Sequence, residues 1–461
     1  MFVGREAELR ELMNQLEETG HAVLIYGKRK IGKTRLIKEA FLCRETAYTN
    51  VYYECIKDSE EANVKSLINI LVNSNIMPEI PFARFTELFA YLNTLPVKIN
   101  IAIDEYPYLK TIEESSLIDS EMQKIIDEHL SNINLILSGS HIGIMKEMME
   151  EGNALYGRFS RIIALKELDY IAASEFYKNK TVYEKIAFYA VFGGSPYINK
   201  QINPDISLRD NIISTILNSG SAAFAYADNL LLTDLKNSVN ASRILSVIGN
   251  GKKRYSELEN ILKLNNNGNL SKQLKTLTEM ETISVNYPIN KPDDRKKRTY
   301  FTEDGFLKFY YCFIYKNKSA LEMLGAESFY ENIVLPGLND FIARRFEEIC
   351  RMWFSLLAKN NLLSGIQNIG TYYYDDPVNK KNGEFDVALK FADGYEIYEV
   401  KYHSSPLEED EINRELSQIS SITELDIRKS GFISVNGFTG GKHSTRFITG
   451  EDIYKINLPE N

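Results

Sequence analysis

The chain has 461 residues, which is too long for one compact domain and predicts roughly two to four folded units. Hydrophobic residues make up 44% of it, charged residues make up 25%, and the net charge is -9, so we expect an ordinary globular protein rather than a wholly basic nucleic-acid binder. The four cysteines are scattered, which argues against a disulfide framework and a cysteine zinc site. No apolar run approaches the about 18 residues that a membrane span needs, which argues against a membrane anchor. With no visible signal peptide, these features favour the cytoplasm.

The first segment, residues 1–165, alternates strand and helix patterns. Short apolar runs predict strands at 22–26, 51–54, 99–103 and 133–137, and helical spacing predicts helices at 34–41 and 60–72. Alternation of this kind predicts a parallel sheet with helices on both faces, which is the α/β class.

Three further segments follow. Residues 166–238 are predicted to be mostly helical, without a convincing strand. Residues 239–338 hold three helical patterns (241–248, 255–262, 270–280) and then two extended stretches (282–287, 299–301), which is typical of a winged helix with linker helices. Residues 339–461 predict a second α/β domain, with helices at 341–358 and 408–422 and strands at 385–391, 395–402 and 431–435.

The loop after the first strand carries a complete GxxxxGK[ST] motif, formed by Gly27, Lys28, Arg29, Lys30, Ile31, Gly32, Lys33 and Thr34. The motif stands between an apolar strand and a helix, which is the context of a phosphate-binding loop, or P-loop. The glycines let backbone N–H groups surround the phosphates, and the helix N-terminus adds a favourable dipole. We expect Lys33 to reach the β- and γ-phosphates of ATP, Thr34 to bind Mg²⁺, and Arg35 to belong to the same ATP-binding set.

The strand pattern at 99–103 leads into two carboxylates, Asp104 and Glu105. Asp104 is expected to hold the Mg²⁺ shell and Glu105 to polarise the attacking water, because phosphoryl transfer depends mostly on positioning. The strand pattern at 133–137 ends in Ser138-Gly139-Ser140, where a sensor of the γ-phosphate is expected, although this tripeptide is also a common turn. These residues predict hydrolysis of ATP.

These motifs, in this order, resemble the archaeal-type ATPase family, which belongs to the STAND branch of the AAA+-related P-loop NTPases. The segments that carry the resemblance are 3–6, the P-loop, 104–109 and 137–140. Tyr156-Gly157-Arg158 is similar to the family's GR motif and Gly193-Gly194-Ser195-Pro196 to its GGxP motif. The resemblance implies that Arg158 contacts the γ-phosphate and that Pro196 lies near the adenine, where a helical lid closes. The alternative for Arg158 is a solvated surface arginine.

The third segment contains three basic clusters. The helix at 270–280 is expected to expose Lys272, Gln273 and Lys275. The loop between the two extended stretches holds Arg295, Lys296 and Lys297, and the third cluster is 252–254. Helix-turn-helix units use such side chains to contact phosphates, so DNA contact is one expectation. The other is that the winged helix serves as a lid or protein contact and that its basic loops are solvated.

In the fourth segment, Asp386 lies on one predicted strand, and Glu399 and Lys401 share one face of the next. Two carboxylates and a lysine at one end of a small sheet suit metal-assisted phosphodiester hydrolysis. This segment resembles the PD-(D/E)XK nuclease fold of a domain that often follows archaeal-type ATPases. The resemblance adds Glu347 on the first helix and Gln418 on the helix at 408–422. The alternative is a hairpin with ordinary alternation of surface charge.

The predicted parts favour an ATP-controlled, Mg²⁺-dependent switch rather than a metabolic kinase, because no segment resembles a small-molecule acceptor domain. We expect DNA as a partner, together with a protein partner or self-association, and no contact with a membrane. The competing hypothesis is a scaffold that holds nucleotide and binds DNA or protein without nuclease activity.

Overall fold

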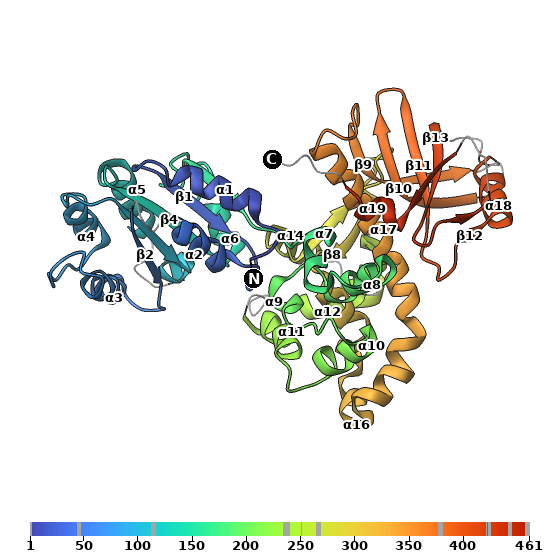
Figure 1. The fold of residues 1–461 in the computed structure, drawn as a ribbon, viewed down its shortest axis with the longest axis horizontal. Helices are drawn as coiled ribbons and strands as arrows, with labels where there is room; N and C mark the ends of the chain where they lie inside the picture. Colours follow the sequence, from blue (N-terminus) through green and yellow to red (C-terminus); the bar gives the residue numbers. More distant parts are fainter. Residues whose placement is uncertain are drawn as a thin grey trace. The chain divides into compact units, whose positions relative to one another are not determined.

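The computed structural model divides the chain into two compact units, Met1–Glu167 and Leu168–Asn461. It describes residues 2–43, 48–111, 117–233, 240–249, 251–263, 269–376, 381–420, 422, 426–440 and 445–456. Each unit has its own main sheet: the first unit appears in blue and teal in Figure 1, and the second runs from green to red. Among the described residues, no helix combines the length and the apolar character needed to cross a lipid bilayer.

The first unit is built on a five-stranded parallel sheet in the order β2-β3-β4-β1-β5. Its strands are β1 (Ala22–Tyr26), β2 (Thr49–Glu54), β3 (Ile99–Asp104), β4 (Ile133–Gly139) and β5 (Arg161–Ala164). β1, β3 and β4 are buried along their whole length, as expected of a parallel sheet covered on both faces. The predicted α/β class is confirmed. The edge strand β5 had no clear apolar pattern, because only Ile163 of its four residues is buried.

Helices cover both faces of this sheet. On one face, α1 (Glu6–Gln15) and α2 (Lys33–Cys43) share a core with Val23 and Ile25 of β1. On the other face, Leu24 belongs to a core that also contains residues of α3 (Glu60–Asn73), α4 (Phe85–Leu92), η1 (Tyr106–Thr111), α5 (Ile118–Glu128) and α6 (Ile142–Glu147). Successive residues of β1 therefore enter opposite cores, which is the alternation that a strand imposes.

The second unit begins with helices, as the sequence predicts for residues 166–238. They are α7 (Tyr170–Ser174), η3 (Glu175–Tyr177), α8 (Val182–Phe192), α9 (Pro196–Asn199), α10 (Leu208–Asn211), η4 (Ile212–Ile216) and α11 (Ala222–Thr233). Thr181 and Glu184 form a capping box that fixes the start of α8. From Ile186 to Phe192 every side chain of α8 is buried, so α8 is the central helix of this group. The helices from α7 to α11 are called the lid below.

A winged helix follows, and its pattern of helices and a hairpin agrees with the sequence. Its helices are α12 (Ala241–Ile248), α13 (Tyr255–Leu262) and α14 (Asn269–Glu279). Its strands are β6 (Lys253–Arg254), β7 (Ile283–Asn286) and β8 (Thr299–Thr302), which form an antiparallel sheet in the order β6-β8-β7. The loop between β7 and β8 is the wing.

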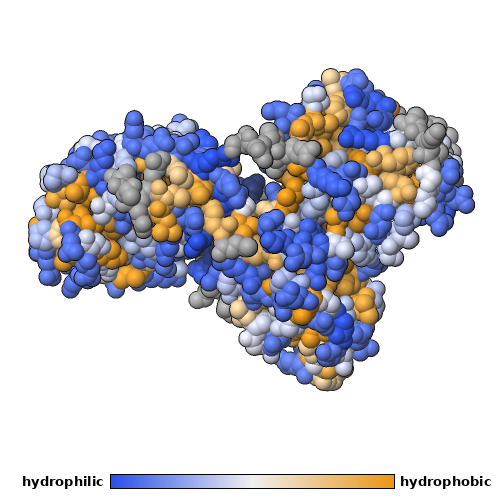
Figure 2. Space-filling view, viewed as in Figure 1, coloured by the Kyte–Doolittle hydropathy of each residue, from blue (hydrophilic) through white to orange (hydrophobic). Residues whose placement is uncertain are grey.

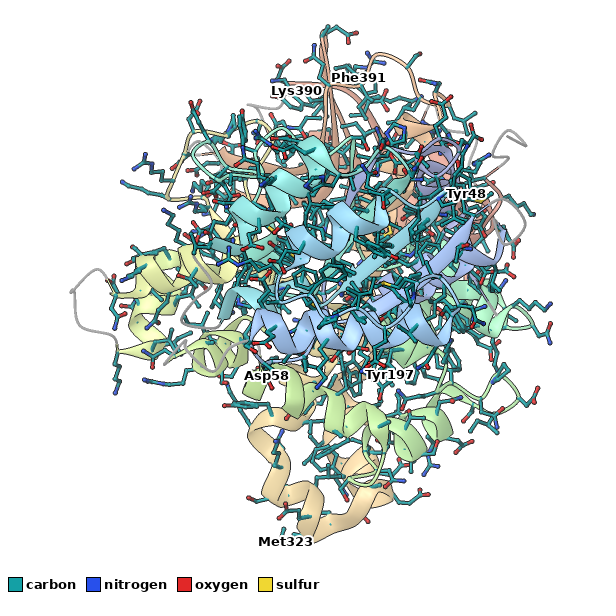
Figure 3. All side chains as sticks on the ribbon, turned by 90° about the vertical axis from the view of Figure 1, so that its left-hand side faces the viewer. Tyr48, Asp58, Tyr197, Met323, Lys390 and Phe391 are labelled. Atoms are coloured by element: carbon teal, nitrogen blue, oxygen red, sulfur yellow. The ribbon has the colours of Figure 1, made fainter. Side chains whose placement is uncertain are left out.

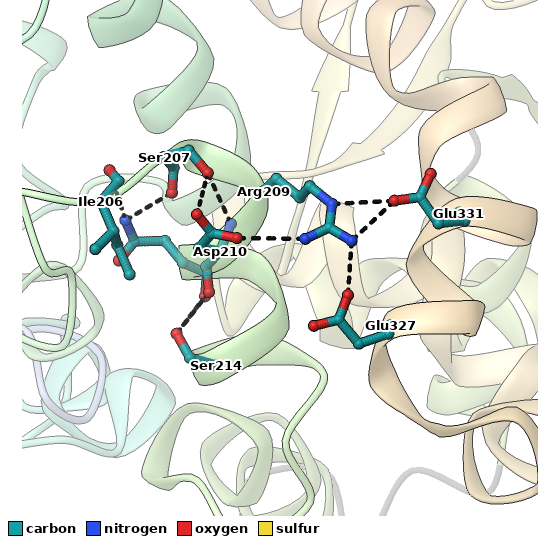
Figure 4. A network of polar contacts seen from close by, with 8 residues as sticks. Ile206, Ser207, Arg209, Asp210, Ser214, Glu327 and Glu331 are labelled. Atoms are coloured by element: carbon teal, nitrogen blue, oxygen red, sulfur yellow. Dashed lines mark hydrogen bonds and ion pairs between the residues drawn. The ribbon is translucent and has the colours of Figure 1, made fainter.

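The next helices connect the winged helix to the C-terminal domain. They are α15 (Gly305–Phe309), η5 (Tyr310–Ile314), η6 (Tyr315–Asn317), α16 (Lys318–Phe329), η7 (Tyr330–Val334) and α17 (Leu335–Lys359). α17 begins at Leu335, before the predicted start at Phe341. The helix can include its proline because that residue stands in the first turn, where a backbone N–H has no partner within the helix and its loss costs nothing. In Figure 4, Arg209 of α10 pairs with Glu327 at 2.6 Å and with Glu331 at 2.9 Å, which links the lid to α16 and η7.

The C-terminal domain has a mixed sheet in the order β15-β13-β11-β10-β9. Its elements are β9 (Asn368–Asp376), β10 (Lys381–Phe391), β11 (Gly394–Lys401), β12 (Leu407–Glu408), α18 (Glu409–Ser420), β13 (Ile427–Ser434), β14 (Phe438–Thr439), β15 (Arg446–Thr449) and α19 (Gly450–Tyr454). β9, β10 and β11 pair antiparallel, whereas β11, β13 and β15 pair parallel. The strands β9 and β15 were not predicted.

One hydrophobic core runs through the whole second unit and contains residues of the lid, the winged helix and the C-terminal domain. The ring of Tyr183 on α8 stacks on Tyr402 with 4.5 Å between centroids, and the hydroxyl of Tyr170 donates to the backbone oxygen of Ile453 at 2.7 Å. Since these segments share one core, the packing does not divide the second unit at residues 238 and 338. The domain boundaries predicted there stay a prediction.

On the face shown in Figure 2, hydrophilic residues predominate on both units and apolar residues form scattered patches. Among the described residues, the most exposed large apolar side chain is that of Met323, at 79% exposure. Met323 lies in the middle of α16, and Lys390 and Phe391 lie at the opposite end of the same unit (Figure 3). The apolar side chains that the folds require are therefore inside the two units.

Candidate nucleotide and nuclease-like sites

The predicted P-loop connects β1 to α2 at the carboxyl end of the parallel sheet. A Cβ added to Gly27 would stand 2.4 Å from the backbone oxygen of Leu165, so only glycine fits there. Gly32 has φ +104°, and a Cβ at that residue would meet no atom within 4 Å. Lys30 also has a positive φ of 63°, which is uncommon outside glycine and concentrates at functional loops. The loop therefore has the special backbone and the open inner side that a phosphate cradle requires.

Lys33 is buried, with 5% of its surface exposed. Its Nζ donates to the backbone oxygens of Gly27 at 3.0 Å and Lys28 at 3.2 Å. The ammonium group thus lies across the loop, on the side that a phosphate would enter.

Asp104, the last residue of β3, forms the second part of this site. Its Oδ2 accepts the hydroxyls of Thr34 and of Tyr52, both at 2.7 Å, and its Oδ1 accepts the backbone N–H of Glu105 at 2.9 Å. Burial opposes ionisation of Asp104, but these hydrogen bonds and the charge of Lys33 hold its pKa below the ordinary value. Thr34 and Asp104 therefore offer two oxygen ligands of the kind that Mg²⁺ prefers, so the residues present fit this metal.

Glu105 follows directly and has φ +52°, a left-handed conformation that costs free energy for a residue with a side chain. Its Oε2 accepts the hydroxyl of Ser140 at 2.8 Å and the backbone N–H of Ser140 at 3.3 Å. The carboxylate is thereby held at the carboxyl end of β4, beside the P-loop strand β1. The sequence singled out both residues, but their direct hydrogen bond could not be read from it.

The flanking basic residues of the P-loop have other contacts. Arg29 donates to the hydroxyl of Tyr108 at 3.3 Å, and Arg35 pairs with Glu39 at 2.7 Å on the exposed side of α2. Lys28 and Ile31 contribute backbone oxygens, which accept from Lys33 and Arg5. Their expected participation in ATP binding stays a prediction.

The family resemblance singles out two further residues, Arg158 and Pro196. Arg158 donates through Nε to both carboxylate oxygens of Asp127 on α5, at 3.0 and 3.1 Å. Its expected contact with the γ-phosphate therefore requires it to leave Asp127. Pro196 begins α9 in the second unit, and its expected place near the adenine stays a prediction.

In the C-terminal domain, the motif residues lie on neighbouring strands. Lys401 Nζ is 3.1 Å from Glu399 Oε1 and 2.9 Å from Glu415 Oε1. Burial raises the pKa of Glu399, and Lys401 opposes that rise. Gln418, the predicted member on α18, lies one turn beyond Glu415 in the same helix. The sequence did not single out Glu415, whose contact with Lys401 depends on how α18 packs.

The other two acidic motif residues, Asp386 and Glu347, do not contact Lys401 but line a cavity. The nuclease-like centre below means Glu347, Asp386, Glu399 and Lys401. The cavity has a volume of about 350 Å³ and lies between the winged helix and α17. Burial, and after it the charge of Asp386, raises the pKa of Glu347 to about 8. Asp386 Oδ1 lies 3.4 Å from Nζ of Lys252, which is also 3.3 Å from Glu384 Oε1.

The nuclease-like residues do not fit a metal ion in this arrangement. Within the described part of the chain, no three carboxylate, histidine or cysteine side chains come together as a metal site. The carboxylates are instead engaged by ammonium groups: Asp386 by Lys252, and Glu399 by Lys401. The sequence predicted that the strand with Asp386 and the strand with Glu399 and Lys401 lie side by side. It did not predict that Lys252, which lies just before β6 of the winged helix, contacts Asp386.

The candidate DNA-binding residues of the winged helix divide into two groups. Lys272 and Lys275 on α14 are exposed, as are Arg295 and Lys296 in the wing, whereas Lys297 lies 3.7 Å above the ring of Tyr373. The expectation that Gln273 is exposed is wrong, since only 9% of its surface is accessible. Gln273 shares the buried stripe of α14 with Leu270, Leu274 and Leu277, at spacings of three and four residues.

Comparison with known proteins gives matches in both units. Residues 2–200 match a family described as an ATPase domain predominantly from Archaea, and residues 310–414 match a family of archaeal and bacterial proteins of unknown function. An uncharacterized protein of Methanocaldococcus jannaschii is 30% identical over 368 residues, which cover 79% of this chain and 79% of that protein. A Walker-type ATPase of Pyrococcus abyssi has a similar fold, with a TM-score of 0.50 and 18% identity, covering 67% of this chain and 96% of that one.

Proposed function

This chain belongs to the family of ATPases found predominantly in Archaea, and from that membership we propose that it is a Mg²⁺-dependent, ATP-hydrolysing switch that acts on DNA. The observation that carries the proposal is the meeting of Lys33, Thr34 and Asp104 at the carboxyl end of the parallel sheet. Ligands of open α/β sheets bind at this edge. Mg²⁺ bound by Thr34 and Asp104 would neutralise charge on the phosphates of ATP.

The residues around the P-loop supply the remaining functions. Lys33 offers an ammonium group to the β- and γ-phosphates, and the backbone N–H groups of the P-loop surround them. Glu105 orients the attacking water, and Ser140 determines where the Glu105 carboxylate rests before ATP binds. Because the phosphoryl group itself needs little covalent help, this positioning accounts for most of the expected catalysis.

The role as a switch follows from where the candidate sites are found. The P-loop belongs to the first unit, and the basic clusters belong to the second. Control of DNA contact by ATP therefore requires the nucleotide state to change the arrangement of the two units. Small-angle scattering in ATP and in ADP tests this requirement, and superimposable profiles would contradict it.

DNA is proposed as the partner because exposed cations gather on the winged helix although the protein as a whole is acidic. Lys272, Lys275, Arg295 and Lys296 are the exposed members. Phosphate contacts of this kind make the affinity fall steeply with salt. Replacing Arg295 and Lys296 by alanine should weaken DNA binding and flatten its dependence on salt concentration. Equal affinity in variant and wild type would favour the scaffold or protein-contact alternative.

A metal-dependent nuclease is the second candidate activity. It is favoured by the nearness of Asp386 to Glu347 and Glu399, since its charge affects the pKa of both, and it requires a metal ion to displace Lys252 from Asp386. The test is incubation of the protein with DNA of varied structure, with and without ATP and Mg²⁺, reading cleavage and ATP turnover together. Asp386→Ala and Lys401→Ala should each abolish cleavage and leave ATP turnover intact. If the wild type nicks no DNA under any condition, the domain binds DNA or protein without cutting.

A further inference from the structure

Lys252 connects the winged helix to the nuclease-like centre. It stands just before β6, in a short segment after α12, and its Nζ lies within ion-pair distance of Asp386 and Glu384 on β10. The segment is fixed at its start, because a Cβ on Gly249 would stand 2.3 Å from the Cβ of Tyr311. Gly251 has φ +120°, a conformation that few other residues adopt, and it turns the chain immediately before Lys252.

Asp386 is equally well fixed from the other side. Arg351 of α17 donates to its backbone oxygen, which holds β10 against that helix. The side chain of Asp386 lines the cavity together with Glu347, while the strand pairing puts β10 beside the strand that carries Glu399. Asp386 is therefore the carboxylate that stands between the other two acidic members of the motif, and Lys252 holds it.

We propose that Lys252 is a resident counter-ion of the nuclease-like centre: its ammonium group stands beside Asp386 where a divalent metal ion would bind, and a nucleic-acid phosphate releases it. This inference rests on the proposed action on DNA and concerns the regulation of the same centre. An ammonium group and a metal ion repel each other, so they compete for one carboxylate at this distance. Lys252 therefore accounts for the engagement of Asp386 by an ammonium group in place of a metal ion.

The cavity explains how DNA would act on Lys252. Four further cations line it, Lys253, Lys308, Arg344 and Arg345, so with Lys252 a phosphate that enters would meet five positive side chains against three carboxylates. An anion that binds Lys252 weakens its hold on Asp386. The Asp386 carboxylate is then available as an oxygen ligand for a metal ion. By thermodynamic linkage, DNA and metal should each raise the affinity for the other.

The test measures Mn²⁺ binding to the full-length, nucleotide-free protein by the electron paramagnetic resonance of free Mn²⁺. Lys252→Met keeps the length of the side chain and removes the charge, and it should bind Mn²⁺ roughly tenfold more tightly than the wild type. Lys253→Met removes another charge from the same cavity and is the matched control; without DNA its gain in Mn²⁺ binding should be clearly smaller than that of Lys252→Met. Lys252→Arg keeps the charge and should also show no gain. Adding Asp386→Asn to Lys252→Met should abolish the gain.

A second arm adds a short DNA duplex. The wild-type complex should bind more Mn²⁺ than the Asp386→Asn complex, which accounts for Mn²⁺ held by the DNA itself. Equal Mn²⁺ binding by Lys252→Met and wild type, or equal gains in Lys252→Met and Lys253→Met, would overturn the role of Lys252. A gain in Lys252→Met without any effect of DNA on the wild type would overturn release by phosphate. ATP turnover, measured in parallel, reports on the proposed function separately, because Lys252 is not part of the P-loop site.

Discussion

The hydroxyl of Tyr52 on β2 lies 2.7 Å from Oδ2 of Asp104 on the neighbouring strand β3. Burial raises the pKa of Tyr52, and the hydrogen bond with Asp104 raises it further, so the phenol remains a donor at all physiological pH values. Tyr52 and Thr34 thus donate to the same carboxylate oxygen. Tyr52 is a positioning residue for Asp104 that no P-loop motif contains.

Replacing Tyr52 by phenylalanine should weaken the response to Mg²⁺ without abolishing turnover. Loss of one hydrogen bond to a charged group costs about 1–2 kcal/mol, so the half-saturating Mg²⁺ concentration should rise by roughly tenfold. The maximal rate at saturating Mg²⁺ should stay close to that of the wild type. Tyr53→Phe is the matched control, because its hydroxyl bonds Asn63 on α3 instead. A change in maximal rate alone would contradict the positioning role.

Lys33→Ala should abolish ATP binding, because it removes the ammonium group that lies across the P-loop. Isothermal titration with ATP measures the effect directly. Lys65→Ala, which removes an exposed lysine from α3, should bind as wild type. Unchanged affinity in a folded Lys33→Ala protein would disprove the nucleotide site.

Glu105→Gln should retain ATP binding and slow hydrolysis by about a hundredfold or more, because the amide can accept a hydrogen bond but is a poor base for water. Single-turnover measurements separate this step from product release. Glu54→Gln is the control: Glu54 ends β2, pairs with Asp104 in register and is exposed. Comparable rates for Glu105→Gln and wild type would show that Glu105 does not orient the attacking water, whereas wild-type turnover indistinguishable from buffer, even with DNA present, would favour the ATP-holding scaffold.

The stability of the first unit should depend on the protonation of Glu60. Burial raises the pKa of Glu60 from 4.5 to about 7, and the neighbouring Glu121 adds to the rise. Between these pH values the folded protein keeps a proton that the unfolded chain has released. The contribution of Glu60 to the free energy of unfolding is therefore full below about pH 4.5 and is lost as the pH rises through about 7.

Thermal unfolding between pH 4.5 and 8 measures this dependence. Glu60→Gln should remove part of the decline in melting temperature, so that the variant gains on the wild type as the pH rises. Its neighbour Glu61 is exposed on the same turn of α3, and Glu61→Gln should leave the profile unchanged. Parallel profiles for wild type and Glu60→Gln would show that the carboxyl is not protonated in the folded state.

The fold was predictable where the pattern is local. Strands β1, β3 and β4 are fully buried, so β1 appears as a continuous apolar run and β3 and β4 as mainly apolar runs that also contain Asn100, Asp104, Asn134 and Ser138. β15 was missed because it has four residues, of which only Ile448 is buried. β9 was missed although it is long, because its tyrosines and flanking polar residues show no clean alternation.

In the candidate sites, too, the local features were predictable and those that depend on packing were not. The P-loop is contiguous, so the sequence identified Lys33 and Thr34 directly. The contacts of Tyr52 with Asp104, and of Lys252 with Asp386, join residues 52 and 134 positions apart, and only the packing of the chain brings them together. Gln273 was assigned to the exposed face because it is polar, but the helical stripe of Leu270, Leu274 and Leu277 decides its burial.

The hydrogen bond between Tyr170 and Ile453 spans 283 positions of the chain. The second unit therefore has a high contact order, and its central helix α8 cannot obtain its final packing partners until α19 has been synthesised. The first unit closes its cores within 167 residues and can fold earlier on the ribosome. During synthesis, the first unit is thus expected to be complete while the aromatic side chains of α8 still lack their final packing partners.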